Sequence, residues 1–156
     1  MNRSFPVLAA AIWLIAAGTD PGAVPMSAQP GTELDAIARH LVADDLAEAQ
    51  AAGETPLVLV GSVQLGSPKD RPALFVQLQS ARECGSSGCS TSVFVSGPKG
   101  WRKVLDAIGT IVVDHAQHRG MHDLVVNRQD RWIWDGASYI DTSPAPVLNL
   151  RPRKQT

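Results

Sequence analysis

A pair of cysteines constrains the fold of this chain more than any other feature. Cys84 and Cys89 are the only two cysteines in the sequence, and they enclose a Gly-Ser-Ser-Gly segment between two runs that are typical of β-strands. A disulfide between them closes a ring of six residues, and chain-entropy arithmetic assigns such a ring only about 2 kcal/mol of stabilisation. We therefore predict an oxidised hairpin, here called the clasp (residues 84–89), that fixes local geometry more than global stability.

The spacing of the cysteines favours a structural role over a redox role. Thiol–disulfide exchange proteins usually carry Cys-x-x-Cys at the N-terminus of a helix, which lowers the pKa of the thiol. Here four residues separate Cys84 from Cys89, in a context that predicts extended structure. Covalent haem attachment would require Cys-x-x-Cys-His, which is absent from the sequence.

The N-terminus is typical of an export signal. Arg3 provides a positive charge, and residues 7–17 form an unbroken apolar run. A helix of that length measures about 16 Å, roughly half the hydrocarbon core of a membrane, so the run predicts secretion better than a membrane span. Cleavage after Gly18 and cleavage after Ala28 are both open, and the alternative is an uncleaved anchor or a buried helix.

The rest of the chain is expected to form one domain. We predict a signal peptide over residues 1–28, a flexible leader over 29–31, a single globular domain over 32–141 and an extended or disordered tail over 142–156. A domain of this size buries about two-thirds of the surface that its unfolded chain exposes, so it has room for a core. Export also implies an oxidising compartment, the periplasm, which agrees with the predicted disulfide.

One amphipathic helix is expected directly after the leader. Thr32 is a typical N-cap, and Glu33 and Asp35 lie in the first turn, where the helix dipole favours negative charge. Apolar residues then recur at helical spacing until Gly53 ends the pattern. We expect this helix to cover one face of a sheet.

Beyond Thr55 the pattern changes to short extended runs separated by turn residues. An Asp-Gly pair at positions 135–136 predicts a tight turn between the last two runs. The predicted fold class is α+β, with the helix packed on a mostly antiparallel β-meander, small barrel or sandwich that carries one disulfide. The expected strands cover residues 57–65, 72–79, 91–96, 101–105, 110–113, 124–127, 131–134 and 137–140.

The charge of the chain is almost balanced. The sequence has 14 basic and 15 acidic residues, a formal net charge of −1 with neutral histidines. Binders of nucleic acid or of membrane surfaces rely on a positive field. We therefore expect no nucleic-acid partner, and membrane association only through protein partners.

Three histidines and two carboxylates fall within residues 114–123. Imidazole and carboxylate groups suit zinc or copper, and one irregular loop would bring His115, His118 and His122 together. Their spacing matches no helical zinc motif such as His-Glu-x-x-His. They are weak candidates for metal ligands, and the favoured interpretation is an exposed histidine loop without metal.

The aromatic residues are candidates for partner binding, because large amphipathic rings dominate interface energetics. Trp132 and Trp134 share a face of a predicted strand, a pattern that is also typical of a core. The partner-binding candidates are Trp101, Trp132, Trp134 and Tyr139.

Catalytic motifs are missing: the sequence has no Gly-x-Ser-x-Gly elbow, no Gly-x-Gly-x-x-Gly, no P-loop and no Ser-x-x-Lys. We therefore predict no catalytic residue.

Several segments between residues 57 and 140 resemble small exported bacterial proteins with a Cys-Gly-x-x-Gly-Cys hairpin. The helical segment at 34–41 adds a similarity to the smallest subunit of the membrane-bound quinoprotein alcohol dehydrogenase of acetic acid bacteria. The segments that carry the resemblance are residues 84–89, 93–95, 100–101, 104–105, 120–126 and 132–139.

This resemblance implies a non-catalytic accessory subunit at the periplasmic face of the inner membrane. Such a subunit has no cofactor of its own and assists the assembly or stability of a larger ethanol-oxidising complex, with a quinoprotein and a cytochrome as partners. Two alternatives stay open. One is a small secreted inhibitor of a lysozyme-like hydrolase, because a rigid hairpin loop can occupy an active site with little loss of conformational entropy. The other is a loop-histidine metal-binding protein.

Overall fold

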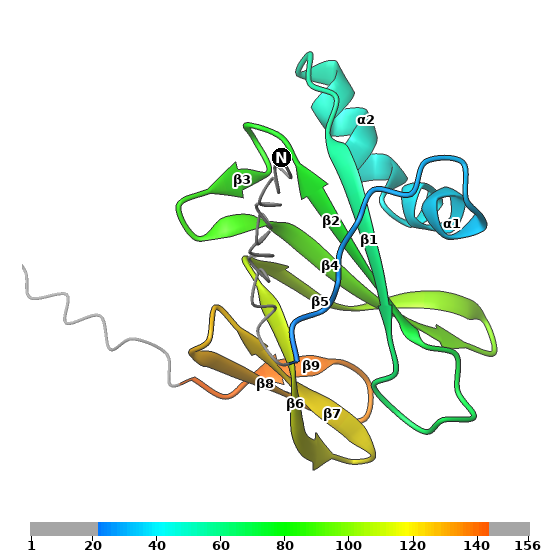
Figure 1. The fold of residues 1–156 in the computed structure, drawn as a ribbon, viewed down its shortest axis with the longest axis vertical. Coiled ribbons are helices and arrows are strands. Elements are labelled where there is room, and N and C mark those ends of the chain that lie inside the picture. The colour runs from blue at the N-terminus through cyan, green and yellow to red at the C-terminus, as the bar shows by residue number, and fades with distance from the viewer. Residues whose placement is uncertain (1–21, 144–156) are drawn as a thin grey trace, which may run out of the picture.

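Two helices precede a series of antiparallel strands in this computed structural model, which describes residues 22–143 (Figure 1). The helices are α1 (Glu33–Leu41) and α2 (Ala43–Ala51). The strands are β1 (Leu57–Val63), β2 (Ala73–Gln79), β3 (Cys84–Gly85), β4 (Gly88–Gly97), β5 (Gly100–Ile108), β6 (Ile111–His118), β7 (Met121–Val126), β8 (Asp130–Trp134) and β9 (Tyr139–Asp141). The predicted α+β class and the antiparallel pairing are confirmed. The apolar run at 7–17 and the tail from residue 144 lie outside the described residues.

The strands form two sheets. The first has the order β1-β2-β4-β3, with β5 also paired to β4, and the second has the order β6-β7-β8-β9. Strands β1 and β6 therefore each form an edge of their own sheet. The chain passes from the first sheet to the second between β5 and β6, through Gly109.

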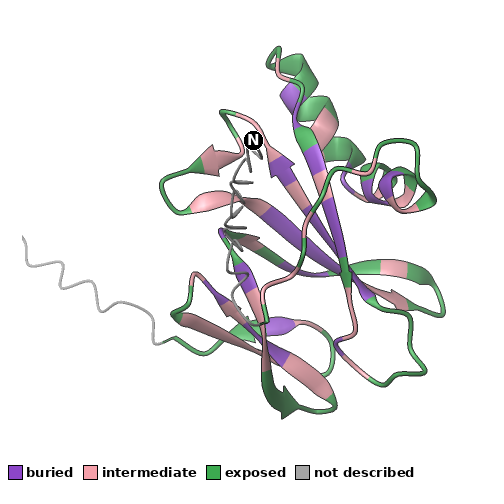
Figure 2. Ribbon diagram, viewed as in Figure 1, coloured by how far each residue is buried: buried purple, intermediate pink, exposed green. Residues whose placement is uncertain are grey.

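The first sheet is the middle layer of the fold. In β2, Leu74 and Val76 pack with the helices, whereas Phe75, between them, packs toward the second sheet. This alternation follows from the period-two geometry of a strand, and it explains why β2 is buried along most of its length (Figure 2). The core between the two sheets contains Leu65, Ala73, Phe75, Val93, Val104, Leu105, Ile111, Leu124, Val126, Trp134 and Tyr139.

The structure divides the predicted single helix into α1 and α2. The predicted N-cap is present, since the Thr32 hydroxyl accepts a hydrogen bond from the backbone N–H of Asp35 at 3.2 Å. The break lies at Val42, whose backbone has φ −111° and ψ 27°, outside the helical range. Val42 is 2% exposed and packs against the first sheet. A β-branched residue is stiff in a helix, and the change of direction there keeps this side chain on the sheet.

Residues 22–28 cross the edges of both sheets in an extended conformation and are here called the strap. Isolated antiparallel bridges join Ala23 to Val112 on β6 and Ser27 to Val60 on β1. Val24 and Met26 are half-buried against the core between the sheets. The predicted cleavage point after Ala28 therefore coincides with the C-terminal end of an ordered, hydrogen-bonded segment.

None of the helices within residues 22–143 has the length and apolar character needed to span a membrane.

Candidate functional site

The predicted disulfide is confirmed, and it closes a short hairpin. The Cys84 and Cys89 sulfur atoms are 2.04 Å apart, and the two residues pair directly across β3 and β4. Gly85 pairs with Gly88, whose φ of 120° lies in the region that favours glycine. Ser86 and Ser87 are exposed at the tip. The clasp therefore presents two hydroxyl side chains on a covalently closed turn.

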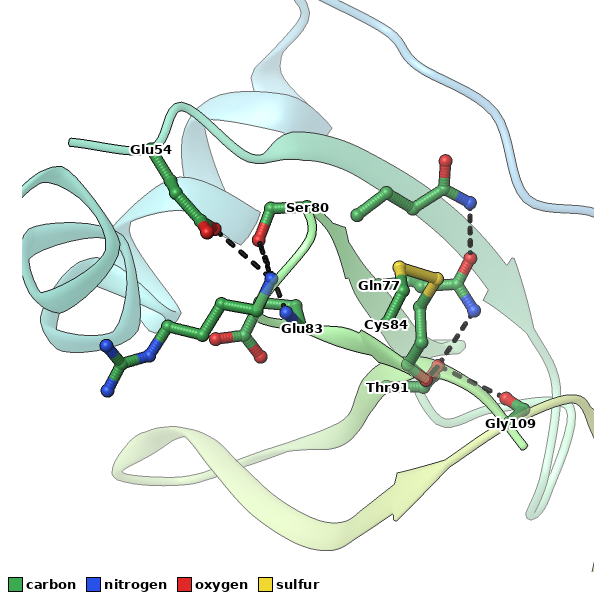
Figure 3. Close-up of a disulfide and its surroundings, with 10 residues drawn as sticks. Glu54, Gln77, Ser80, Glu83, Cys84, Thr91 and Gly109 are labelled. Atoms are coloured by element: carbon green, nitrogen blue, oxygen red, sulfur yellow. Dashed lines mark hydrogen bonds between the residues drawn. A yellow bond between two sulfur atoms is a disulfide. The ribbon is translucent and has the colours of Figure 1, made fainter. Parts of the chain in front are cut away.

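The N-terminal side of the clasp is fixed by hydrogen bonds to the end of β2. The backbone N–H of Cys84 donates to the Ser80 carbonyl at 3.1 Å. The Ser80 hydroxyl accepts the backbone N–H groups of Arg82 and Glu83, each at 3.3 Å, and the Glu54 carboxylate also accepts from Arg82 at 3.3 Å (Figure 3). The clasp is therefore anchored before its first cysteine.

The C-terminal side of the clasp contacts residues 109–110, the segment that joins the two sheets and is here called the passage between the sheets. The backbone N–H of Gly109 donates to the Cys89 carbonyl at 3.0 Å. The Thr91 hydroxyl lies 3.4 Å from the Gly109 carbonyl and accepts a hydrogen bond from the Gln77 amide at 3.0 Å (Figure 3). A Cβ at Gly88 would lie 2.5 Å from the Gly109 Cα, so neither backbone leaves room for a side chain there.

Asn127, which follows β7 of the second sheet, hydrogen-bonds to the segment that joins the two sheets. Its side-chain oxygen accepts the Thr110 N–H at 3.1 Å, and its side-chain nitrogen donates to the Ile108 carbonyl at 2.9 Å. A Cβ on Gly109 would lie 1.9 Å from Asn127 Oδ1 and would therefore overlap this side chain. Asn127 has φ 51°, a left-handed conformation that asparagine tolerates in tight turns. We call Ile108, Gly109, Thr110 and Asn127 together the junction.

The clasp and the junction form the walls of a polar cleft of about 590 Å³, here called the clasp cleft. Its lining consists mainly of hydroxyl and amide groups, with one arginine and one aspartate whose formal charges cancel. The lining residues are Ser86, Ser87, Thr110, Asn127, Arg128, Gln129 and Asp130. Such a surface offers hydrogen-bond donors and acceptors to a polar, uncharged ligand or to a protein loop.

The histidine segment was predicted to be an irregular loop, and that prediction is wrong. Residues 114–118 belong to β6 and residues 121–123 belong to β7, joined by a turn at Arg119 and Gly120. The register pairs Gln117 with His122 and His118 with Met121. Because residues 115–120 are exposed, their sequence lacks the alternation of a half-buried strand and resembles a loop.

An ion-pair network connects three strands at this hairpin. Asp123 on β7 is fully buried, and its carboxylate contacts His118 Nδ1 at 2.6 Å and Arg131 Nη1 at 2.9 Å. Arg131 on β8 also donates to the Asp114 carboxylate on β6 at 2.6 Å. The backbone N–H of Ala116 and the Arg131 guanidinium both hold the pKa of Asp114 below its usual value. The network thus fastens β6, β7 and β8 together.

The three histidines do not share one centre. His118 contacts Asp123, whereas His122 contacts the Asp114 carbonyl at 2.8 Å through Nδ1 and the Gln117 amide at 2.9 Å through Nε2. His115 is exposed on β6. Over residues 22–143, no three histidine, cysteine or carboxylate side chains are grouped in a way that suits a metal ion.

The four aromatic candidates occupy two environments. Trp134 and Tyr139 are 9% and 4% exposed and stack edge to face at 5.3 Å within the core between the sheets. The Tyr139 hydroxyl donates to the His122 carbonyl at 2.7 Å, and burial raises the pKa of that hydroxyl. Trp101 and Trp132 are half-buried, Trp101 against the helix-side core and Trp132 against the core between the sheets. The aromatic residues therefore form no common exposed face.

The junction was not identified from the sequence. Gly109 falls between the expected strands 101–105 and 110–113, and Asn127 falls at the end of the expected strand 124–127. A local signal exists, since asparagine is one of the few residues that tolerate positive φ in a turn. Asn127 and Arg128, with φ 51° and 63°, are the central residues of a turn closed by a 3.1 Å hydrogen bond from the Gln129 N–H to the Val126 carbonyl. This turn lies in the three-residue loop between Val126 and its strand partner Asp130.

No known protein family, no curated protein and no solved structure matches this chain.

The role of Asn127 is testable by two substitutions. Asn127→Gly retains access to the left-handed backbone but removes both side-chain hydrogen bonds, so we expect a loss of about 1–2 kcal/mol in the free energy of unfolding. Asn127→Ala loses the same hydrogen bonds and adds the left-handed backbone cost of about 1 kcal/mol. Urea unfolding of the three proteins measures both effects. A glycine variant as stable as the wild type would contradict the proposed role of the side chain.

The pH dependence of stability tests the Asp114 ion pair. Because the native pKa of Asp114 is lowered, this group stabilises the fold above its unfolded pKa of about 4, and the contribution is lost as the pH falls through the native pKa. Asp114→Asn should therefore reduce stability at neutral pH by up to about 1 kcal/mol. The difference from the wild type should shrink below about pH 4. Urea titrations from acid to neutral pH measure it, and a constant difference would contradict this account.

Proposed function

We propose that this protein is a non-catalytic accessory subunit that docks on a larger exported oxidoreductase complex through the clasp cleft. The observation that carries the proposal is the construction of the cleft. One wall is closed by a disulfide, and the other is held by the two side-chain hydrogen bonds of Asn127. Binding to a surface whose shape is already fixed loses less conformational entropy than binding to a mobile loop.

The chemistry of the cleft supports a protein partner. Ser86 and Ser87 at the clasp tip are exposed, and Gln129 on the opposite wall is exposed as well. Hydroxyl and amide groups of this kind form hydrogen bonds with the backbone and the polar side chains of a partner loop. Protein interfaces typically contain about one such hydrogen bond per 100–200 Å². The opposite formal charges of Arg128 and Asp130 leave the cleft without a strong preference for a charged ligand.

The finer proposal names the partner as a membrane-bound quinoprotein alcohol dehydrogenase. Its support is the resemblance to the smallest subunit of that complex. In this proposal the protein acts at the periplasmic face of the inner membrane, holds no cofactor of its own and aids the assembly or stability of the complex. The large quinoprotein and the cytochrome carry out ethanol oxidation.

Site-directed photo-crosslinking in the native host tests this proposal. A photoreactive amino acid at Ser86 should form an adduct with a quinoprotein or cytochrome subunit, identified by mass spectrometry. The matched control carries the same amino acid at Glu48, which is exposed on α2 and should give little of that adduct. Deletion of the chain should lower the ethanol-oxidising activity of washed membranes, and the wild-type gene should restore it.

Two outcomes would contradict the proposal. Equal crosslinking from Ser86 and Glu48 would remove the clasp cleft as the docking site. An adduct between Ser86 and a cell-wall hydrolase, with inhibition of lysozyme by the purified protein, would instead favour the inhibitor alternative, in which the clasp tip occupies the active site of a hydrolase.

A further inference from the structure

The strap supplies hydrogen bonds to the exposed edges of both sheets. Ser27 exchanges two backbone hydrogen bonds with Val60 on β1, at 3.0 and 2.9 Å. The carbonyl of Gly22 accepts the N–H of Val113 on β6 at 2.9 Å. Since β1 and β6 are edge strands, the backbone groups of Val60 and Val113 that bond to the strap have no partner strand of their own sheet on the outer side. Uncovered edge strands promote pairing with other chains, so a covering segment protects the fold.

The inward side chains of the strap complete the core between the sheets. Val24 and Met26 point inward at period-two spacing and pack against that core, while Pro25 and Ser27 are exposed. Together with Phe75 and Ile111, Val24 and Met26 line a cavity of about 170 Å³ beneath the strap. Without the strap this side of the core would open to water.

Gly61 shows that the amino-acid sequence of β1 accommodates the strap. A glycine within a strand costs conformational entropy and contributes no side chain to the core. The backbone of Gly61 does not have the positive φ that would require glycine. A Cβ at this position would instead lie 2.6 Å from the Pro25 carbonyl oxygen, 2.7 Å from Met26 Sδ and 2.9 Å from Val24 Cγ1. The glycine is required only when the strap crosses β1.

We propose that export processing of this chain occurs before Gly22, and that residues 22–28 remain in the mature protein as a structural strap. Cleavage after Ala28 would remove the hydrogen bonds to Val60 and Val113 and the two apolar side chains described above. Processing after Gly18 leaves the whole strap in place, with the small residue Ala16 at the position three residues before the cut. This inference does not depend on the proposed function.

The N-terminus of the exported protein tests the proposal directly. The full-length gene is expressed with export into a bacterial periplasm, and the product is examined by intact mass and N-terminal sequencing without denaturing purification. The expected first residue lies between residues 18 and 22, with residue 19 corresponding to cleavage after Gly18. A mature protein that begins at Gln29, or an unprocessed chain that begins at Met1, would overturn the proposal.

A substitution at Gly61 tests the strap independently of processing. In the exported protein, Gly61→Val should lower the melting temperature by roughly 5 °C or more, because the added atoms collide with the strap. The matched control is Gly97→Val on β4, where an added Cβ meets only the Gly100 carbonyl at 3.8 Å; we expect little change. If Gly61→Val is as stable as the wild type, the strap does not cover β1 in solution. If that variant fails to fold, Gly61→Ala gives the same comparison with a smaller side chain.

Discussion

The close contact of three backbone segments at Gly109 is the constraint on which this fold depends. Gly109 lies where the chain leaves the first sheet and enters the second, and both the clasp and the Asn127 side chain contact it. Added Cβ atoms at Gly88 and Gly109 would lie 2.5 Å from the Gly109 Cα and 1.9 Å from the Asn127 amide oxygen, respectively. A larger residue at either glycine would separate the clasp or the turn from the passage between the sheets. The relative position of the two sheets is therefore fixed by these two close contacts at Gly109.

This contact gives the disulfide a role beyond its own loop. A six-residue ring contributes little to global stability, but here it holds Cys89, whose carbonyl accepts the Gly109 N–H. The same arrangement forms both walls of the clasp cleft, so the proposed docking surface and the passage between the sheets are parts of one rigid unit. The strap also joins the two sheets, through its hydrogen bonds to Val60 and Val113. Its Val24 and Met26 side chains line one cavity together with Gly109 and Thr110, so the strap and the clasp both constrain the space between the sheets near the junction.

Local patterns in the sequence were sufficient for the disulfide, the antiparallel strands and the helix N-cap at Thr32, because each depends on residues close together in the chain. The junction could not be predicted from local patterns, because Asn127 bonds to Thr110 and Ile108, which are 17 and 19 residues away in the sequence. The strap could not be predicted for the same reason: its residues fall in the segment assigned to the signal peptide (1–28), and its partners Val60 and Val112 are distant in the sequence. Trp132 and Trp134 follow a pattern that fits either a core or an interface, and only the position of the opposing sheet shows that Trp134 is buried in the core.

Amide hydrogen exchange at Gly109 and Thr110 tests the central claim, that the clasp and Asn127 together hold the passage between the sheets. In the oxidised protein we expect the N–H groups of both residues to be protected, because one donates to the Cys89 carbonyl and the other to the Asn127 side chain. Reduction of the Cys84–Cys89 disulfide should accelerate exchange at both amides while the buried amides of β2 stay protected. Unchanged exchange at Gly109 and Thr110 after reduction would show that the clasp does not support the junction, and would contradict this account.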